Sequence, residues 1–282
     1  MKRIALINDV SGFGKCSLTA AIPVISVMGM QACPLPTAVL TSQTGFEHYY
    51  CDDYTDKMDI FTDYWKKLGV SFDGICSGYL ANYRQIEKVL GFLTEFQKEE
   101  TFFLADPVLG DQGELFKSFD HRLVEEMKQL VKNADVITPN LTELCLLADV
   151  DFFSLQKYKN SSDYVERIET IGREVLRKAK KQQQIIVTGI LTQKEEKDRI
   201  GNLVISKGSI YYRDMHYTGK SFSGTGDLFA SVVCGAMVKG MTAKQAVDKA
   251  VYFLQEAIDE ASREDIPTVH GVNFEAYLSR LL

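Results

Sequence analysis

Short apolar runs alternate with amphipathic segments along most of the chain, and this alternation constrains the fold more than any other feature. The apolar runs cover residues 4–8, 39–41, 74–80, 101–108, 135–140 and 184–191, and helical periodicity covers 53–68, 83–98, 121–132 and 162–181. Repetition of strand, helix and strand favours parallel pairing with right-handed crossovers. The sequence therefore predicts an α/β fold of three layers, a doubly wound and mainly parallel sheet with helices on both faces.

The pattern changes late in the chain. Two strand-like runs, 201–206 and 209–217, are joined by a turn at 207–208, which indicates an antiparallel strand pair. A stripe of mostly small residues then recurs at helical spacing over 243–258, as expected for a helix packed closely on a sheet. No linker, repeat or low-complexity segment divides the 282 residues, so we expect a single domain over 1–282.

Charge and composition exclude several classes of protein. The formal net charge of −6 disfavours a nucleic-acid partner, which needs a basic face. The longest apolar stretches, such as 232–238, are too short to cross a bilayer, and residues 1–3 lead straight into a strand rather than a signal sequence. The six cysteines show neither a Cys-x-x-Cys pair nor clustering with histidine. We therefore expect a cytoplasmic protein with reduced thiols and no membrane partner.

The first glycine-rich segment, NDVSGFGKCS at 8–17, is a weak nucleotide motif. A phosphate-binding loop needs a glycine where Asp9 stands and a hydroxyl where Cys16 stands, and Ser17 occupies the third glycine position of a dinucleotide fingerprint. The segment nevertheless follows a predicted first strand, and open α/β sheets bind ligands at the carboxyl ends of strands. It is either a plain strand-to-helix turn or a site for a ligand other than a triphosphate.

The strongest local signal is SFSGTGD at 221–227, a glycine-rich turn that opens directly into an apolar helix. Free N–H groups at Gly224, Thr225 and Gly226 would make an anion hole at the positive end of the helix dipole. Asp227 has two possible roles there. It either stabilises the start of the helix or accepts a proton from a substrate hydroxyl during phosphoryl transfer.

Two further strand ends carry acidic groups. In the stretch 136–143, Asn140 and Glu143 lie within one helical turn and suit Mg²⁺ through its waters, although the same spacing describes a capping box. In ADPVLGD at 105–111, Asp106 and Asp111 flank a turn, which indicates either a cation site or a proline-led turn with a capping aspartate. If the topology is right, all these strand ends converge on one crevice.

Together these motifs resemble the ribokinase-like superfamily of small-molecule kinases, and within it the pyridoxal kinase branch. The resemblance spans nearly the full length, and its motifs are TSQTGF at 41–46, SGYL at 77–80, DPVLGD at 106–111, TPNLTE at 138–143 and GTGDL at 224–228. Gln43 stands where a histidine is usual in that branch.

The resemblance implies an enzyme that uses ATP and Mg²⁺ to phosphorylate the hydroxymethyl group of pyridoxal, pyridoxine or pyridoxamine, and it implies a homodimer. The roles that it implies are a general base at Asp227; an anion hole at Gly224, Thr225 and Gly226; nucleotide contacts at Asn140, Thr188 and Thr138; a metal site at Glu143, Asp106 and Asp111; and contacts to the substrate at Asp9, Ser11, Thr44 and Tyr79.

Other functions remain open on the same residues. The segment 8–14 is more similar to the Ser-Asp-Pro-Ser-Gly-Gly-Ala-Gly turn of hydroxymethylpyrimidine kinases, but those enzymes often carry cysteine in place of Asp227 and lack the Gly78-Tyr79 pair. A non-catalytic ligand-binding protein on this fold is a further alternative, and an NAD-dependent oxidoreductase is disfavoured by the broken glycine fingerprint. The polar segment 111–118 is either a lid that excludes water or an ordinary surface loop.

Overall fold

The computed structural model describes residues 1–282, which form two compact units. The first unit combines Met1–Leu104 with Lys220–Leu282, and the second is Ala105–Gly219. The second unit is therefore inserted in the sequence of the first. None of the helices combines the length and the apolar composition that spanning a lipid bilayer requires.

The first unit is built on a mainly parallel sheet. Its strands are, in order across the sheet, β5 (Phe102–Ala105, whose last residue belongs to the second unit), β4 (Gly74–Ser77), β1 (Arg3–Ser11), β2 (Gln31–Leu40) and β3 (Cys51–Asp53). β1 pairs in parallel with both β4 and β2, and β3 runs antiparallel to β2. The core of β1 is an apolar run, because a strand covered on both faces must be apolar on both. Ile4 and Ile7 are both fully buried.

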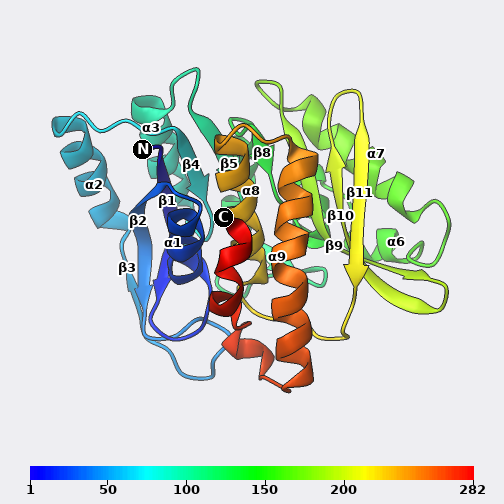
Figure 1. The fold of residues 1–282 in the computed structure, drawn as a ribbon. Coiled ribbons are helices and arrows are strands. Elements are labelled where there is room, and N and C mark those ends of the chain that lie inside the picture. The colour runs from blue at the N-terminus through cyan, green and yellow to red at the C-terminus, as the bar shows by residue number, and fades with distance from the viewer. The chain divides into compact units, whose positions relative to one another are not determined.

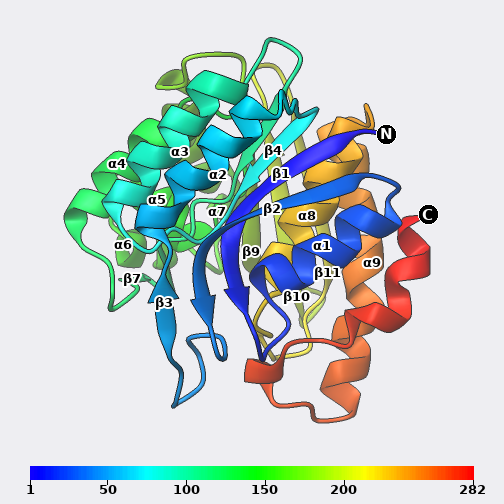
Figure 2. The ribbon, with the colours of Figure 1, turned by 90° about the vertical axis from the view of Figure 1, so that its left-hand side faces the viewer.

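Helices cover both faces of this sheet. The helices of the first unit are α1 (Ser17–Val27), α2 (Thr55–Lys67), α3 (Tyr83–Phe96), α8 (Thr225–Val238) and α9 (Ala243–Arg263), followed by the short 3₁₀ helices η1 (Thr268–His270) and η2 (Phe274–Leu281). Figures 1 and 2 show α1, α8 and α9 on one face and α2 and α3 on the other. α8 is apolar on almost all sides because it is buried between the sheet and α9.

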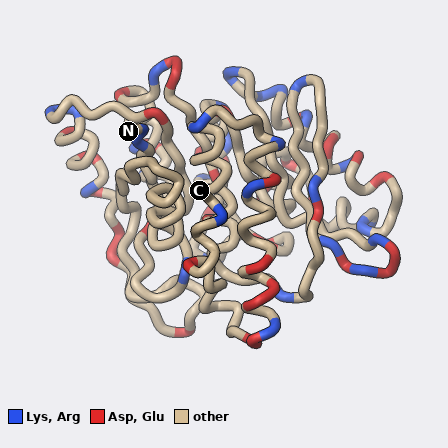
Figure 3. Tube along the Cα trace, in the orientation of Figure 1, with Lys and Arg blue, Asp and Glu red and all other residues tan.

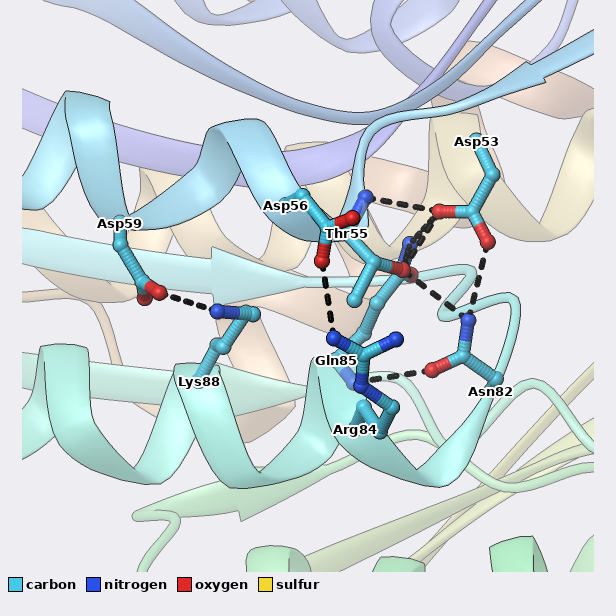
Figure 4. A network of polar contacts seen from close by, with 8 residues as sticks. All are labelled: Asp53, Thr55, Asp56, Asp59, Asn82, Arg84, Gln85 and Lys88. Atoms are coloured by element: carbon cyan, nitrogen blue, oxygen red, sulfur yellow. Dashed lines mark hydrogen bonds and ion pairs between the residues drawn. The ribbon is translucent and has the colours of Figure 1, made fainter.

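A network of polar contacts, buried at Thr55 and Gln85, holds α2 against α3 (Figure 4). The Asp53 carboxylate accepts the N–H of Thr55 at the start of α2, and Asn82 caps α3 by accepting the N–H of Gln85. The Gln85 amide nitrogen, which is fully buried, donates to Asp53, to the Thr55 hydroxyl and to the carbonyl of Thr37 in β2. The network therefore ties the first turns of both helices to the sheet.

The second unit carries its own strands and helices. Its strands are β6 (Gly110–Asp111), β7 (Glu114–Leu115), β8 (Val136–Ile137), β9 (Gln184–Lys194), β10 (Lys197–Ile205) and β11 (Ile210–His216), and its helices are α4 (His121–Val131), α5 (Leu141–Ala148), α6 (Phe152–Gln156) and α7 (Tyr164–Arg177). β8 and β9 are parallel, whereas β9, β10 and β11 are antiparallel neighbours. β6 and β7 form a separate hairpin.

The predicted fold class is confirmed, but several element bounds were wrong. The strand predicted over 39–41 extends back to Gln31. The added part contains Pro34 and Pro36, which lie where β2 pairs only with β1. Proline is tolerated where no neighbouring strand needs its missing N–H. The late antiparallel pair has a third member, since β9 also pairs with β10. The segment 111–118 contains most of the small β6–β7 hairpin.

Charged side chains of both signs are mixed along the chain (Figure 3). The lysine-rich run 177–181 lies at the end of α7, as predicted, and its cations have acidic neighbours. The Lys181 ammonium lies 2.7 Å from the Asp135 carboxylate, and that of Lys178 lies 3.9 Å from Asp149. This run is therefore a helix end with local ion pairs.

Candidate active site

The first cluster of predicted site residues lies in the first unit, where α8 begins. Gly224 is the residue that precedes the helix, and its φ of 80° lies in the left-handed region that favours glycine. A Cβ atom at this position would lie 1.8 Å from the carbonyl oxygen of Lys15. The N–H groups of Gly226 and Asp227 follow in the first turn, where a helix offers them no carbonyl partner of its own. The turn thus presents donors at the positive end of α8.

Asp227 holds its carboxylate at this helix start. The side chain is half-buried, and its Oδ1 accepts a hydrogen bond of 3.0 Å from the amide nitrogen of Asn8. Burial, with a smaller contribution from the Asp9 carboxylate, raises the pKa of Asp227 to about 6, although hydrogen bonds from the Ser17 N–H and from Asn8 act in the opposite direction. A carboxylate with such a pKa is a suitable general base near neutral pH.

Asn8 joins Asp227 to the other predicted substrate contacts. Its Oδ1 accepts the N–H groups of Asp9 at 3.0 Å and Tyr79 at 2.8 Å. Asp9 in turn accepts a 2.9 Å hydrogen bond from the Ser11 hydroxyl, and both side chains are buried. Burial raises the pKa of Asp9 above its ordinary value. The Asn8 side chain thus contacts the Asp227 carboxylate and the backbone N–H groups of Asp9 and Tyr79, and the Asp9 side chain contacts Ser11.

The segment around Thr44 is tied to the same turn by Gln43. The Gln43 amide nitrogen donates to the Val269 carbonyl at 2.9 Å and to the Ser223 hydroxyl at 3.3 Å, and its oxygen accepts the N–H of Gly45 at 2.7 Å. Gln43 is buried, whereas Thr44 is exposed. Gln43 therefore braces the loop next to Gly224 and leaves Thr44 accessible to a ligand.

Three aromatic rings that the sequence analysis did not assign to the site form a cluster at this loop. The rings of Phe13, Phe46 and His270 pack against one another, with centroids 5.2 to 5.5 Å apart. Phe13 keeps 55% of its surface exposed, although it is a large apolar residue. The exposed face of this group is suited to contact an apolar or aromatic ligand.

The second cluster lies in the second unit, at the start of α5. Asn140 and Glu143 form the complete capping box: the Asn140 side chain accepts the N–H of Glu143 at 3.0 Å, and Glu143 Oε2 accepts the N–H of Asn140 at 2.8 Å. Glu143 Oε1 accepts the N–H of Leu109 at 3.1 Å. Both carboxylate oxygens are therefore held by backbone donors, which makes the capping interpretation of this motif correct as a description of its geometry.

Acidic and hydroxyl groups surround this cap. Thr138 donates to Asp106 Oδ1 at 2.7 Å, and the Asn140 amide nitrogen donates to the Gly110 carbonyl at 2.8 Å. Thr188 is bridged to Asn140 as in a parallel pair of strands. Within the second unit, the structure thus brings together Thr138, Asn140, Thr188, Glu143 and Asp106, and Asp111 follows in β6.

The charges in this cluster suit a hydrated cation. Burial, and next the nearby Asp106 carboxylate, raise the pKa of Glu143 well above its ordinary value, and Asp111 adds to the effect. No group of three or more His, Cys, Asp or Glu side chains in residues 1–282 is placed to bind a metal ion directly. Each carboxylate oxygen has a second lone pair, so these acids fit Mg²⁺ that keeps its waters and is carried by a nucleotide.

Comparison with known proteins identifies the family. Residues 16–271 match the model of the phosphomethylpyrimidine kinase family. The "putative pyridoxal kinase BUD16" of Saccharomyces cerevisiae is 30% identical over 200 residues, which are 66% of this chain and 57% of that protein. The chain spans about half the length of the first curated relatives that it matches.

Solved structures agree with the fold. A "putative phosphomethylpyrimidine kinase" from Bacteroides thetaiotaomicron, in a crystal form with pyridoxal, is 36% identical and superposes with a TM-score of 0.89, covering 99% of this chain and 95% of its own. Pyridoxal kinase from Lactobacillus plantarum is 24% identical, with a TM-score of 0.88 and coverage of 100% and 97%. The likeness to the second protein shows a shared fold alone.

Proposed function

The chain belongs to the phosphomethylpyrimidine kinase family, and we propose that it phosphorylates the hydroxymethyl group of pyridoxal, pyridoxine or pyridoxamine with ATP. The observation that carries this proposal is the placement of Asp227. Its carboxylate lies in the first turn of α8 beside backbone N–H groups, and its pKa is raised to about 6. The similarity to the Bacteroides thetaiotaomicron protein that was crystallised with pyridoxal supports the choice of substrate.

In the proposed reaction, Asp227 takes the proton of the substrate hydroxyl, and the hydroxyl oxygen attacks the γ-phosphorus in line. The new O–P bond forms while the bond between the γ-phosphorus and the bridging oxygen of ADP breaks, so that ADP leaves with that electron pair. The N–H groups of Gly224, Thr225 and Gly226 stabilise the transferring phosphoryl group. Preorganised donors of this kind contribute about 3–4 kcal/mol each in enzymes that use them.

The nucleotide is assigned to the second cluster. Asn140, Thr138 and Thr188 would contact its phosphates, and Glu143 and Asp106, with Asp111, would hold the waters of Mg²⁺. When bound, the metal ion neutralises charge on the phosphate oxygens. Because both Glu143 oxygens already accept backbone N–H groups, this carboxylate acts through water rather than by direct ligation.

The substrate ring is assigned to Asp9, Ser11, Thr44 and Tyr79. Ser11 offers a hydroxyl to a polar substituent of the ring, and Tyr79 offers an aromatic face. Thr44 is accessible because Gln43 holds its loop against Val269 and Ser223.

Phosphorylation of hydroxymethylpyrimidine is the second candidate function. It is favoured by the family model, whose description names phosphomethylpyrimidine, and by the segment 8–14. Both functions use the same base and anion hole, and they differ only in the ring that the first cluster accepts. A non-catalytic ligand-binding protein is the third candidate.

We include the organisation of the protein in the proposal. The two units act as one kinase domain over residues 1–282, because the second is inserted in the first and the family match spans both. A homodimer in the cytoplasm follows from the resemblance to pyridoxal kinases. Sedimentation equilibrium tests the dimer, and a single species of about 32 kDa would contradict it.

An ADP-release assay tests the function. We expect ADP production with ATP and Mg²⁺ in the presence of pyridoxal, pyridoxine or pyridoxamine, a slower reaction with hydroxymethylpyrimidine, and a phosphate ester of the acceptor as the product seen by ³¹P NMR. Faster turnover of hydroxymethylpyrimidine selects the second candidate. Absence of ADP with all four alcohols selects the non-catalytic protein.

A further inference from the structure

Asn8 has an unusually constrained position. It lies in the last part of β1, directly after the buried apolar run 4–7, and only 8% of its surface is exposed. Its side-chain oxygen accepts two backbone N–H groups, those of Asp9 and Tyr79. Because an oxygen must face those donors, the amide nitrogen has to point the other way. It points at Asp227 Oδ1, 3.0 Å away.

Gly78 provides the room for this amide. A Cβ atom at Gly78 would lie 2.4 Å from the Asn8 amide nitrogen and 3.0 Å from its oxygen. The backbone of Gly78 is itself fixed, because its N–H donates to the Ile7 carbonyl at 2.9 Å. The missing side chain at residue 78 therefore allows Asn8 to reach Tyr79 and Asp227 together.

We propose that Asn8 is a positioning residue, which fixes the carboxylate of Asp227 for proton transfer and links it through one amide to the Tyr79 peptide on the substrate side. The proposal rests on the proposed function, in which Asp227 is the base. It adds a role for the first residue of the segment 8–17, to which the motifs assigned none.

The charges around Asp227 determine what the loss of Asn8 does. Asp9 in β1 and the Cys16 thiol just before α1 are the titratable groups that interact with it, and the Ser17 N–H donates to it from the first turn of α1. Burial and Asp9 raise the pKa of Asp227, whereas Asn8 and Ser17 lower it. Removal of the Asn8 donor should therefore raise the pKa of Asp227 further.

Asn8→Asp tests this role, because its carboxylate still accepts from Asp9 and Tyr79 but presents an oxygen instead of a donor to Asp227. We expect the acid limb of the pH profile of kcat/KM to move up by about one pH unit, which lowers kcat/KM about fivefold at pH 6, where the wild-type carboxyl is about half ionised, and restores it at pH 9. Ser231→Ala is the matched control, since the Ser231 hydroxyl donates to the Asp227 carbonyl and not to the carboxylate. We expect its acid limb to stay at the wild-type position.

A second variant allows the test to be made even if Asn8→Asp does not fold. Gly78→Ala leaves Asn8 in place but pushes its amide aside, and we expect the same shift of the acid limb. An acid limb at the wild-type position in a folded Asn8→Asp or Gly78→Ala protein overturns the proposal. Failure of the wild-type enzyme to phosphorylate any acceptor concerns the proposed function instead. In that case ¹³C NMR titration of the Asp227 carboxyl, which needs no turnover, shows whether the Asn8 donor acts on it.

Discussion

Gly224→Ala is the most direct perturbation of the proposed anion hole. Gly224 has a φ of 80°, and a Cβ atom there would lie 1.8 Å from the carbonyl oxygen of Lys15. Cβ atoms rarely approach such an atom closer than 3.0 Å, so the turn or the Lys15 peptide must move by about 1.2 Å. The obstacle is backbone and has no rotamer that would avoid the clash. The start of α8 must therefore move relative to the start of α1.

Gly29→Ala separates the two causes of this effect. Gly29 has a φ of 79°, almost the same as Gly224, but a Cβ atom there would meet nothing within 4 Å. Its substitution costs only the left-handed backbone, about 1 kcal/mol in the free energy of unfolding. Gly224→Ala adds an overpacking cost of about 1–3 kcal/mol, for a total of about 2–4 kcal/mol.

The two variants are compared by thermal unfolding and by the ADP-release assay. We expect Gly224→Ala to lower Tm by about 3–7 °C. We expect it to lower kcat by about 100-fold, because a shift of about 1 Å in reacting groups has that effect. Gly29→Ala should lower Tm by only a few degrees, with unchanged kcat. Equal behaviour of the two variants would refute the argument that the Lys15 contact positions the anion hole.

The remaining predictions concern the two carboxylates. Asp227→Asn should lower kcat by about two to four orders of magnitude without changing the Kd of ATP, and near-normal turnover removes the assignment of the base. With wild-type enzyme, kcat/KM should fall about tenfold per pH unit below about pH 6, because Asp227 must be deprotonated to act; a limb near pH 4 contradicts the raised pKa. The folded protein binds the Asp227 proton more tightly than the unfolded chain does, so ionised Asp227 destabilises the fold above pH 6. At pH 8, Asp227→Asn should therefore unfold at a higher temperature than the wild-type protein. Glu143→Gln should require more Mg²⁺ for half-maximal activity, and an unchanged metal titration argues against the proposed role. The same variant should lower the free energy of unfolding by about 1–3 kcal/mol, because its NH₂ group would face a backbone N–H.

The sequence predicted the fold class because the hydrophobic periods are strong. The helices α3 and α4 begin at the predicted residues, Tyr83 and His121, where Asn82 and Asp120 supply the caps. The bounds of β2 could not be predicted in the same way, because Pro34 and Pro36 argue against a strand unless its neighbours are known. The placement of β3 decides which part of β2 lacks a second partner, and a local sequence pattern does not show that placement.

The candidate site shows the same division. Residues recognisable from local motifs, such as Gly224, Asp227 and Glu143, lie at the helix starts where the motifs placed them. Asn8 could not be recognised, since its role depends on Tyr79 and Asp227, which are 71 and 219 residues away in the sequence. The available signal was a polar side chain that directly follows the apolar run 4–7 of a buried strand, which indicates a partner but does not identify it.

The capping geometry of Asn140 and Glu143 leaves room for the metal role that we propose for Glu143. The capping box fixes Glu143 by using one lone pair on each oxygen, and a carboxylate has about four such acceptor positions. The two N–H donors oppose the rise in pKa that burial and Asp106 produce, so they favour the charged form that a cation requires. A cap that holds a buried carboxylate in place is therefore compatible with the role that we propose for Glu143, which is to support the waters of a nucleotide-bound metal ion. The same reasoning applies to Asp227, where N–H and amide donors orient a carboxylate at the start of a helix and keep its pKa low enough to act as a base near pH 7.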